Sequence, residues 1–230
     1  PGIGTFDMAV GDFNGDGKLD IALAGYIGST QGVVQIELGK GDGTFTDGER
    51  ILLASNLNAT GITTGDFNGD GNIDLAVCTG DERGATLLVG DGTGGFPTRS
   101  SIKLSSACLD VVTADYNRDG KPDLVFRLER GPLTPITFIT LNEGNGVFGT
   151  ATSITPFDAF GIASGDVNND GIPDVVVFLA GVVESLVGDG TGKFASKGFA
   201  LGPFPTLFHF SQNPILADVN GDGFRDVVIC

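Results

Sequence analysis

The chain has 230 residues, a formal net charge of −16 from 13 basic and 29 acidic residues, and a hydrophobic content of 40%. That length suffices for one large domain or an array of small units, and the hydrophobic content argues against disorder. The acidic balance excludes a surface for nucleic acid or anionic membranes, because both require a basic face. A single His excludes a multi-histidine metal centre, and no apolar run of 18 residues is present to span a membrane.

The acidic residues are unevenly divided, since 23 are Asp and only 6 are Glu, and Gly accounts for 38 residues. Asp is typical of turns and metal-binding loops, whereas helix surfaces favour Glu. Together with the abundant Gly, this composition predicts an all-β chain that is rich in turns.

One phrase recurs five times along the chain. It reads GDFNGDGKLD from Gly11, GDFNGDGNID from Gly65, ADYNRDGKPD from Ala114, GDVNNDGIPD from Gly165 and ADVNGDGFRD from Ala217. Successive copies are separated by 54, 49, 51 and 52 residues. A period of about 50 residues matches one four-stranded propeller blade better than a helical repeat.

Each copy lies between two strand-like segments. Residues 6–10, 61–64, 109–113, 160–164 and 214–216 precede the five copies, and apolar runs such as 21–24 and 175–179 follow them. Four copies are then followed by a second strand pair around a Gly-rich turn, which ends at Phe45, Phe96, Phe148 or Phe194. The repeat unit is therefore predicted as strand A, Asp loop, strand B, connecting loop, strand C, Gly turn and strand D, giving eighteen strands in all.

We predict a single β-propeller domain over residues 1–230, with repeats at approximately 5–58, 59–107, 108–158 and 159–210 and a partial fifth repeat at 211–230. The fifth copy has no second strand pair after it. Three arrangements stay open. The fifth blade can be a two-stranded half that closes a five-bladed ring, the chain can be part of a larger propeller, or another chain can complete the blade.

Oxygen-bearing side chains recur at fixed places in the five copies, which we call the Asp loops and number from the leading Asp. Positions 1, 3, 5 and 9 are Asp, Asn, Asp and Asp in every loop: Asp12, Asn14, Asp16 and Asp20; Asp66, Asn68, Asp70 and Asp74; Asp115, Asn117, Asp119 and Asp123; Asp166, Asn168, Asp170 and Asp174; Asp218, Asn220, Asp222 and Asp226. Position 6 is always Gly. Position 7, which can offer its backbone carbonyl, is Lys18, Asn72, Lys121, Ile172 or Phe224.

Alternating hard oxygen ligands followed by a Gly that permits a sharp turn are what Ca²⁺ requires. An EF-hand loop places its last acid at position 12 between helices, whereas here the last acid is at position 9 between strands. We therefore predict a strand–loop–strand calcium site in up to five copies. Mg²⁺ fits less well, because it demands stricter octahedral geometry. The alternative is a set of Asx-turns without an ion, although turns also tolerate Ser, Gly and Lys, which none of the twenty positions holds.

These residues resemble the FG-GAP/VCBS-type repeats of integrin α-subunit propellers and of many secreted bacterial proteins. The resemblance covers essentially the whole chain, through D-x-N-x-D-G-x-x-D five times and the Gly turn that ends in Phe. It implies that the twenty side chains above bind calcium in loops that join the inner strands of each blade, on the face opposite the usual ligand surface. The Phe-Gly…Gly-Ala-Pro signature of that family is absent apart from Phe148-Gly149, which favours the looser bacterial type over a cell-adhesion protein.

Three weaker features favour structural over chemical roles. The G-x-G-x-x-G match at 90–95 precedes no helical pattern, so we interpret it as a hairpin turn rather than a dinucleotide site. His209 has no nucleophile near it in sequence and is expected to pack or to face solvent. Cys78 and Cys230 share one repeat position, which favours packing, and a disulfide between Cys78 and Cys108 stays open.

The connecting loops between strands B and C vary most and form the candidate recognition face, although solvated loops without a partner are an equal alternative. They cover 25–32, 79–85, 127–137 and 179–183. We predict a calcium-binding propeller without enzymatic activity that recognises protein or carbohydrate ligands outside the cell, lectin-like or adhesive in type. It binds no nucleic acid, does not insert into membranes, and has the fifth blade available for self-association. The alternative is a propeller domain of a secreted polysaccharide-active enzyme. No signal peptide is present in the chain.

Overall fold

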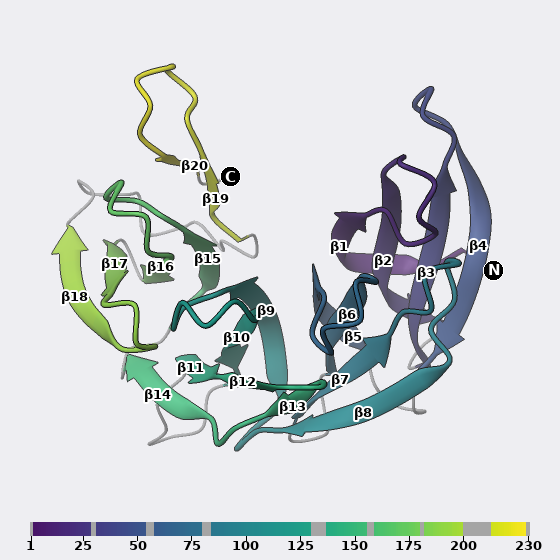
Figure 1. Cartoon of the computed structure of the whole chain (residues 1–230), viewed down its shortest axis with the longest axis horizontal. Coiled ribbons are helices and arrows are strands. Elements are labelled where there is room, and N and C mark those ends of the chain that lie inside the picture. The colour runs from purple at the N-terminus through teal and green to yellow at the C-terminus, as the bar shows by residue number, and fades with distance from the viewer. Residues whose placement is uncertain are drawn as a thin grey trace. The chain divides into compact units, whose positions relative to one another are not determined.

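The prediction of an all-β fold is confirmed. A computed structural model describes residues 2–28, 31–53, 58–79, 84–129, 137–155, 159–179, 182–199 and 213–228, and within these ranges it contains strands and turns but no helix (Figure 1). None of the described residues therefore forms a helix that could cross a membrane.

Each of the first four repeats forms its own four-stranded antiparallel sheet. The first sheet contains β1 (Gly4–Gly11), β2 (Asp20–Ile27), β3 (Gln31–Gly39) and β4 (Phe45–Leu52). The second contains β5 (Ala59–Gly65), β6 (Asp74–Thr79), β7 (Gly84–Val89) and β8 (Thr98–Lys103). The third contains β9 (Cys108–Ala114), β10 (Asp123–Leu128), β11 (Thr137–Thr140) and β14 (Thr152–Thr155). The fourth contains β15 (Gly161–Gly165), β16 (Asp174–Leu179), β17 (Val182–Gly188) and β18 (Phe194–Phe199). The fifth repeat contributes the pair β19 (Ile215–Ala217) and β20 (Asp226–Val228).

Each Asp loop joins strands A and B of its repeat, as the sequence predicts. The residue before position 1 pairs with the Asp at position 9, for example Gly11 with Asp20 and Gly65 with Asp74. Position 9 is therefore the first residue of strand B, which fixes its carboxylate against the sheet.

The third repeat departs from the predicted strand count. Its Gly turn forms an extra ribbon, β12 (Asn142–Gly144) paired with β13 (Val147–Phe148), so that the described residues contain 20 strands rather than eighteen. In the other turns the position of Asn142 is Gly39, Gly90 or Gly188, where an added Cβ would lie only 2.1, 2.2 and 2.5 Å from a loop carbonyl oxygen. Asn142 carries a Cβ there, so we attribute the break between β11 and β12 to this steric conflict.

The contacts divide the chain into two compact units, Pro1–Val111 with Asn142–Gly149, and Val112–Leu141 with Thr150–Cys230. In the first unit, small side chains of the first sheet such as Ala22 and Val34 pack against Ile62, Leu75 and Val77 of the second sheet. In the second unit, a core around Tyr116, Val125, Ile162 and Val175 joins the third and fourth sheets, and Leu216 of β19 packs beside Val176. Face-to-face sheets thus bury the alternating apolar residues of consecutive repeats.

Cys78 and Cys108 form a disulfide that links β6 to β9, with a Cα–Cα distance of 5.0 Å. Both residues are completely buried, so each contributes to packing as well as to the covalent link. From the sequence, a disulfide between these residues stayed open and packing was favoured for Cys78. The two residues are 30 positions apart, and only the pairing of strands from consecutive repeats brings their sulfurs together. Cys230 and His209 lie outside the described residues.

Candidate metal site in the Asp loops

The side chains at positions 1 and 3 of every Asp loop converge on one backbone amide. The N–H of position 5 donates to Oδ1 of the Asp at position 1 over 3.0–3.2 Å and to Oδ1 of the Asn at position 3 over 2.8–3.0 Å, in all five loops. Two predicted ligand oxygens therefore lie close to the same backbone nitrogen, that of position 5. The side chains predicted to bind the metal thus also stabilise the curved backbone of the loop.

The same Asp at position 1 also stabilises the sharp turn at position 6. Its second oxygen accepts the N–H of the invariant Gly over 2.8–2.9 Å in every loop. That Gly has φ between 80° and 89° throughout, a left-handed conformation that L side chains rarely adopt. Position 4 is also left-handed, which the sequence did not reveal because it holds Arg118 and Asn169 as well as glycines.

Replacing Gly71 by Ala isolates this backbone requirement. Gly71 has φ +89°, and an added Cβ would meet nothing within 4 Å, so the strain is purely conformational. We expect Gly71→Ala to lower the free energy of unfolding by about 1–2 kcal/mol. Gly198→Ala is the matched control, because its Cβ also meets nothing within 4 Å and its φ is not left-handed. Urea denaturation should show the control unchanged or slightly more stable; equal losses would refute the explanation.

The Asp at position 9 accepts hydrogen bonds from the backbone, and in the first four loops it is buried. Asp20, Asp74, Asp123 and Asp174 have no exposed surface. In every loop Oδ2 of this Asp accepts the N–H of position 2 over 2.9–3.0 Å. Oδ1 accepts the N–H of the Gly that opens the Gly turn in three repeats, over 2.8–2.9 Å. Burial raises the pKa of Asp74 and Asp174 above the ordinary value. Position 9 thus connects its loop to its sheet independently of any ion.

The Asp at position 5 is exposed and takes different partners in different loops. In the first and third loops a Lys at position 7 reaches it, with Lys18 Nζ 3.0 Å from Asp16 Oδ2 and Lys121 Nζ 2.5 Å from Asp119 Oδ2. These ammonium groups hold the pKa of both carboxyls below the usual range. In the second, fourth and fifth loops the Asn at position 3 donates its side-chain N–H instead.

The donor set fits Ca²⁺ in chemistry. The oxygens at positions 1 and 3 already converge, position 5 adds an exposed carboxylate, and each carboxylate keeps lone pairs beyond those used by N–H donors. Within the described residues, however, no three His, Cys, Asp or Glu side chains gather closely enough to hold a metal ion. The carboxylate of position 9 accepts N–H groups of the backbone. Calcium binding through the twenty predicted ligands stays a prediction.

The Gly turn of one repeat closes on the Asp loop of the repeat before it. The backbone N–H of the turn glycines Gly94, Gly146 and Gly192 donates to the carbonyl of loop position 2 over 2.9, 3.0 and 3.1 Å. The Phe that ends each turn packs against the position-2 ring, in the pairs Phe13–Phe96, Phe67–Phe148 and Tyr116–Phe194, with centroids 5.8, 5.8 and 5.6 Å apart. The sequence contains a signal for this contact. Position 2 is aromatic in the three loops that a Gly turn contacts, and it is Val in the other two loops.

The 90–95 segment and two acidic residues outside the Asp loops have structural partners. The 90–95 segment is a turn into β8, in which the Thr93 amide and hydroxyl donate to Asp91, so the hairpin interpretation is confirmed. Asp7, one of the acids outside the loops, accepts the N–H of Ile62 over 2.9 Å, and burial raises its pKa. Glu184 is buried and accepts a hydrogen bond from Ser196.

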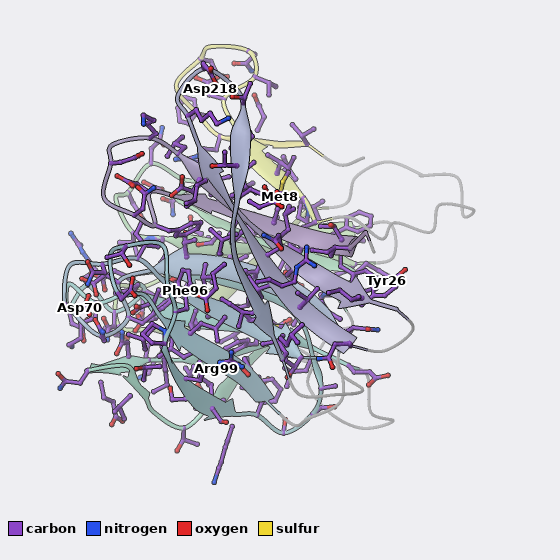
Figure 2. All side chains as sticks on the ribbon, turned by 90° about the vertical axis from the view of Figure 1, so that its right-hand side faces the viewer. Met8, Tyr26, Asp70, Phe96, Arg99 and Asp218 are labelled. Carbon is purple, nitrogen blue, oxygen red and sulfur yellow. A yellow bond between two sulfur atoms is a disulfide. The ribbon has the colours of Figure 1, made fainter. Side chains whose placement is uncertain are left out.

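The end of the sheets opposite the Asp loops carries the predicted recognition face. Figure 2 shows Asp70 at one end of the first unit and Tyr26 at the other. Residues 29–30, 80–83, 130–136 and 180–181 of the connecting loops lie outside the described part of the chain. At this end of the second sheet lies an open cavity of about 410 Å³, lined by Thr79, Gly84, Ala85, Thr86, Ser101, Ile102 and Lys103. A second open cavity, of about 420 Å³, lies beside Glu49 and Asp91, where the Glu49 carboxylate accepts the Phe96 N–H.

Comparison with solved structures places the fold among propeller proteins. An Agrocybe aegerita lectin, described as recognising non-reducing terminal N-acetylglucosamine, matches 95% of this chain with a TM-score of 0.62 at 20% identity. The chain spans 58% of the length of that lectin. A looser match, with a TM-score of 0.40 at 16% identity, joins 84% of the chain to 39% of the V. cholerae biofilm matrix protein Bap1. No curated protein matches the sequence.

The family comparison supports the interpretation of the motif directly. The family model described as FG-GAP-like repeat matches residues 12–77 and 74–126, which together cover half of the chain and include the first three Asp loops. The predicted resemblance and the predicted propeller fold are thereby confirmed. The repeated Asp loops, the four-stranded sheets and this match agree, and the chain belongs to the FG-GAP-like repeat family.

Proposed function

We propose that this chain is a calcium-stabilised recognition module that binds carbohydrate outside the cell and has no enzymatic activity of its own. The observation that carries the proposal is the 410 Å³ cavity at the end of the second sheet. Its volume lies in the range of small-ligand sites, which is about 300–1,000 Å³. The cavity also lies at the end of the second sheet from which the variable connecting loop between strands B and C extends.

The lining of this cavity suits a sugar. Thr86 and Ser101 are paired across β7 and β8, and Lys103 pairs with Gly84, so two hydroxyl groups and one ammonium group lie on adjacent strands. Ile102 and Ala85 are buried and add an apolar floor. Sugars present hydroxyl groups at their edges and C–H groups on their faces, which this mixture of donors and apolar carbon complements. The matched lectin is described as recognising a ligand of this class, non-reducing terminal N-acetylglucosamine.

Two features support an extracellular location. A buried disulfide is typical of oxidising compartments and is rare in the cytosol. Calcium loops of extracellular modules commonly have dissociation constants of about 10⁻⁴–10⁻³ M, which external but not cytosolic calcium would satisfy.

A glycan array probed in millimolar calcium tests the proposal, with N-acetylglucosamine-terminated glycans as the first ligands to examine. We expect Ser101→Ala and Lys103→Ala each to weaken binding by about tenfold, equivalent to ~1.4 kcal/mol, because each removes one polar contact. Lys197→Ala on β18 is the matched control and should bind as the wild type does. Absence of glycan binding, or equal binding by all three variants, would overturn the carbohydrate proposal.

A further inference from the structure

The residue at position 7 divides the five Asp loops into two kinds. It is Lys in the first and third loops and uncharged in the other three, in chain order Lys18, Asn72, Lys121, Ile172 and Phe224. Each Lys forms an ion pair with the carboxylate at position 5 of its own loop, which is a predicted calcium ligand. In two loops, therefore, a cation of the chain itself already lies on one of the ligands.

The Gly turn of the first repeat helps to position Lys18. An added Cβ at Gly41 would lie 3.0 Å from Lys18 Cδ and 3.4 Å from its Cγ, so the aliphatic stem of the lysine lies against the turn. The equivalent pairs in the second and fourth repeats are Asn72 with Gly92 and Ile172 with Gly190. Position 7 in these repeats therefore lies between the Asp loop and the Gly turn, and this placement brings the Lys18 ammonium group to within 3.0 Å of Asp16.

Where position 7 is uncharged, the carboxylate at position 5 has a neutral partner instead. In the second, fourth and fifth loops its Oδ2 accepts the side-chain N–H of the Asn at position 3, over 2.8–3.1 Å. Arg225 adds a positive charge at position 8 of the fifth loop, but its Nη1 donates to the Leu216 carbonyl. Among the described residues, a cation thus lies on a predicted ligand in the first and third loops alone.

A calcium ion that enters the first or third loop must displace the Lys or bind beside it. Displacement breaks the ion pair, whereas binding beside the Lys brings a divalent cation close to a like charge. The side chains of both ion pairs are between 35% and 43% exposed, so solvent screens the charges and the effect is moderate. Because calcium loops tune their affinity through the charge around the ion, we expect the dissociation constants of these two loops to be about three- to tenfold higher.

We propose that Lys18 and Lys121 set the calcium affinity of their loops, so that the five Asp loops form two classes of site. This inference rests on the proposed calcium-stabilised function. The second, fourth and fifth loops fill first, and the first and third loops fill only at higher calcium concentrations. Rising calcium therefore stabilises the chain in two steps, and the residue at position 7 decides to which step a loop belongs.

Exchanging the residues at position 7 between the first two loops tests this proposal. Isothermal titration calorimetry of the calcium-depleted wild type with calcium should resolve three tighter and two weaker sites. Lys18→Asn should change this to four and one, and Asn72→Lys should change it to two and three. Lys40→Asn is the matched control, because it removes the same charge from the neighbouring Gly turn, where Lys40 is exposed and has no ion pair within the described residues. It should keep three tighter and two weaker sites.

Tyr116 provides a readout that is specific to the third loop. It occupies position 2 of that loop, the chain has no Trp, and the only other tyrosine, Tyr26, lies at the end of its unit opposite the Asp loops (Figure 2). Luminescence of Tb³⁺ excited through tyrosine therefore reports on binding at the third loop. We expect Lys121→Asn to reach half-maximal luminescence at a Tb³⁺ concentration about three- to tenfold lower than the wild type does, and Lys40→Asn to match the wild type.

The outcomes separate this inference from the proposed function on which it rests. Five equal calcium sites in the wild type, or the same Tb³⁺ titration for Lys121→Asn and the wild type, would overturn the two classes and leave calcium binding in place. Absence of calcium binding in the wild type would overturn both the two classes and the stabilising role of the ion.

Discussion

Asp74→Ala should lower the free energy of unfolding by about 3–5 kcal/mol, even in calcium-free buffer. Asp74 is completely buried, and its carboxylate accepts the N–H groups of Phe67, Asn68 and Gly90 over 2.9, 3.2 and 2.9 Å. Alanine would leave these donors without their acceptor where water is excluded. Burial raises the pKa of Asp74, and the three backbone hydrogen bonds act in the opposite direction.

Asp70→Ala is the control for this prediction. Asp70 belongs to the same loop but is exposed, and it accepts N–H groups from Asn68 and Asn72. Without calcium we expect this variant to lose less than about 1 kcal/mol, as exposed substitutions usually do. Denaturant titrations in chelator compare the two variants. Equal losses would show that position 9 has no special role in connecting the loop to the sheet.

Millimolar calcium should raise the melting temperature of the wild type by about 10 °C or more, and chelator should reverse the change. Each ion that binds only the folded chain stabilises it by RT ln(1 + [Ca²⁺]/Kd), which is about 0.4–1.4 kcal/mol per loop when calcium is one to ten times the Kd, and five loops add their contributions. The physical reason is the repulsion among the carboxylates of each loop, which a divalent ion offsets.

The Asp70→Ala variant distinguishes metal binding from folding in the same experiment. It removes a predicted ligand from one loop, so its gain in melting temperature with calcium should be smaller than that of the wild type, although the two melt alike in chelator. Differential scanning calorimetry with and without calcium measures both quantities. A melting temperature that calcium leaves unchanged would contradict the stabilising role of the ion.

The sequence predicted the repeat, the strand order within each blade and the positions of the Asp loops, because those follow from local periodicity. It did not predict which oxygens face the strands. Position 9 was predicted as a calcium ligand, and that stays a prediction. The structure adds that Asp74 pairs with Gly65 at the start of strand B and accepts backbone N–H groups. The left-handed conformation at Arg118 was also hidden, since only a Gly would have signalled it.

Contacts between repeats were the other gap, because they depend on how sheets pack rather than on any one segment. Asn142 replaces a Gly that allows close backbone approach, and this substitution gave no warning of the extra β12–β13 ribbon. The bond between Cys78 and Cys108 joins strands of different repeats in the same way. The aromatic residues at position 2, in contrast, could have been matched with the Phe of each turn from the sequence alone.

Calcium binding by the Asp loops is the central claim, and counting bound ions tests it most directly. Equilibrium dialysis against radioactive calcium should reach about five ions per chain at saturation, one for each Asp loop. Asp70→Ala should bind one ion fewer than the wild type. A wild-type stoichiometry near zero at millimolar calcium would contradict the account and leave the loops as turns held by hydrogen bonds alone.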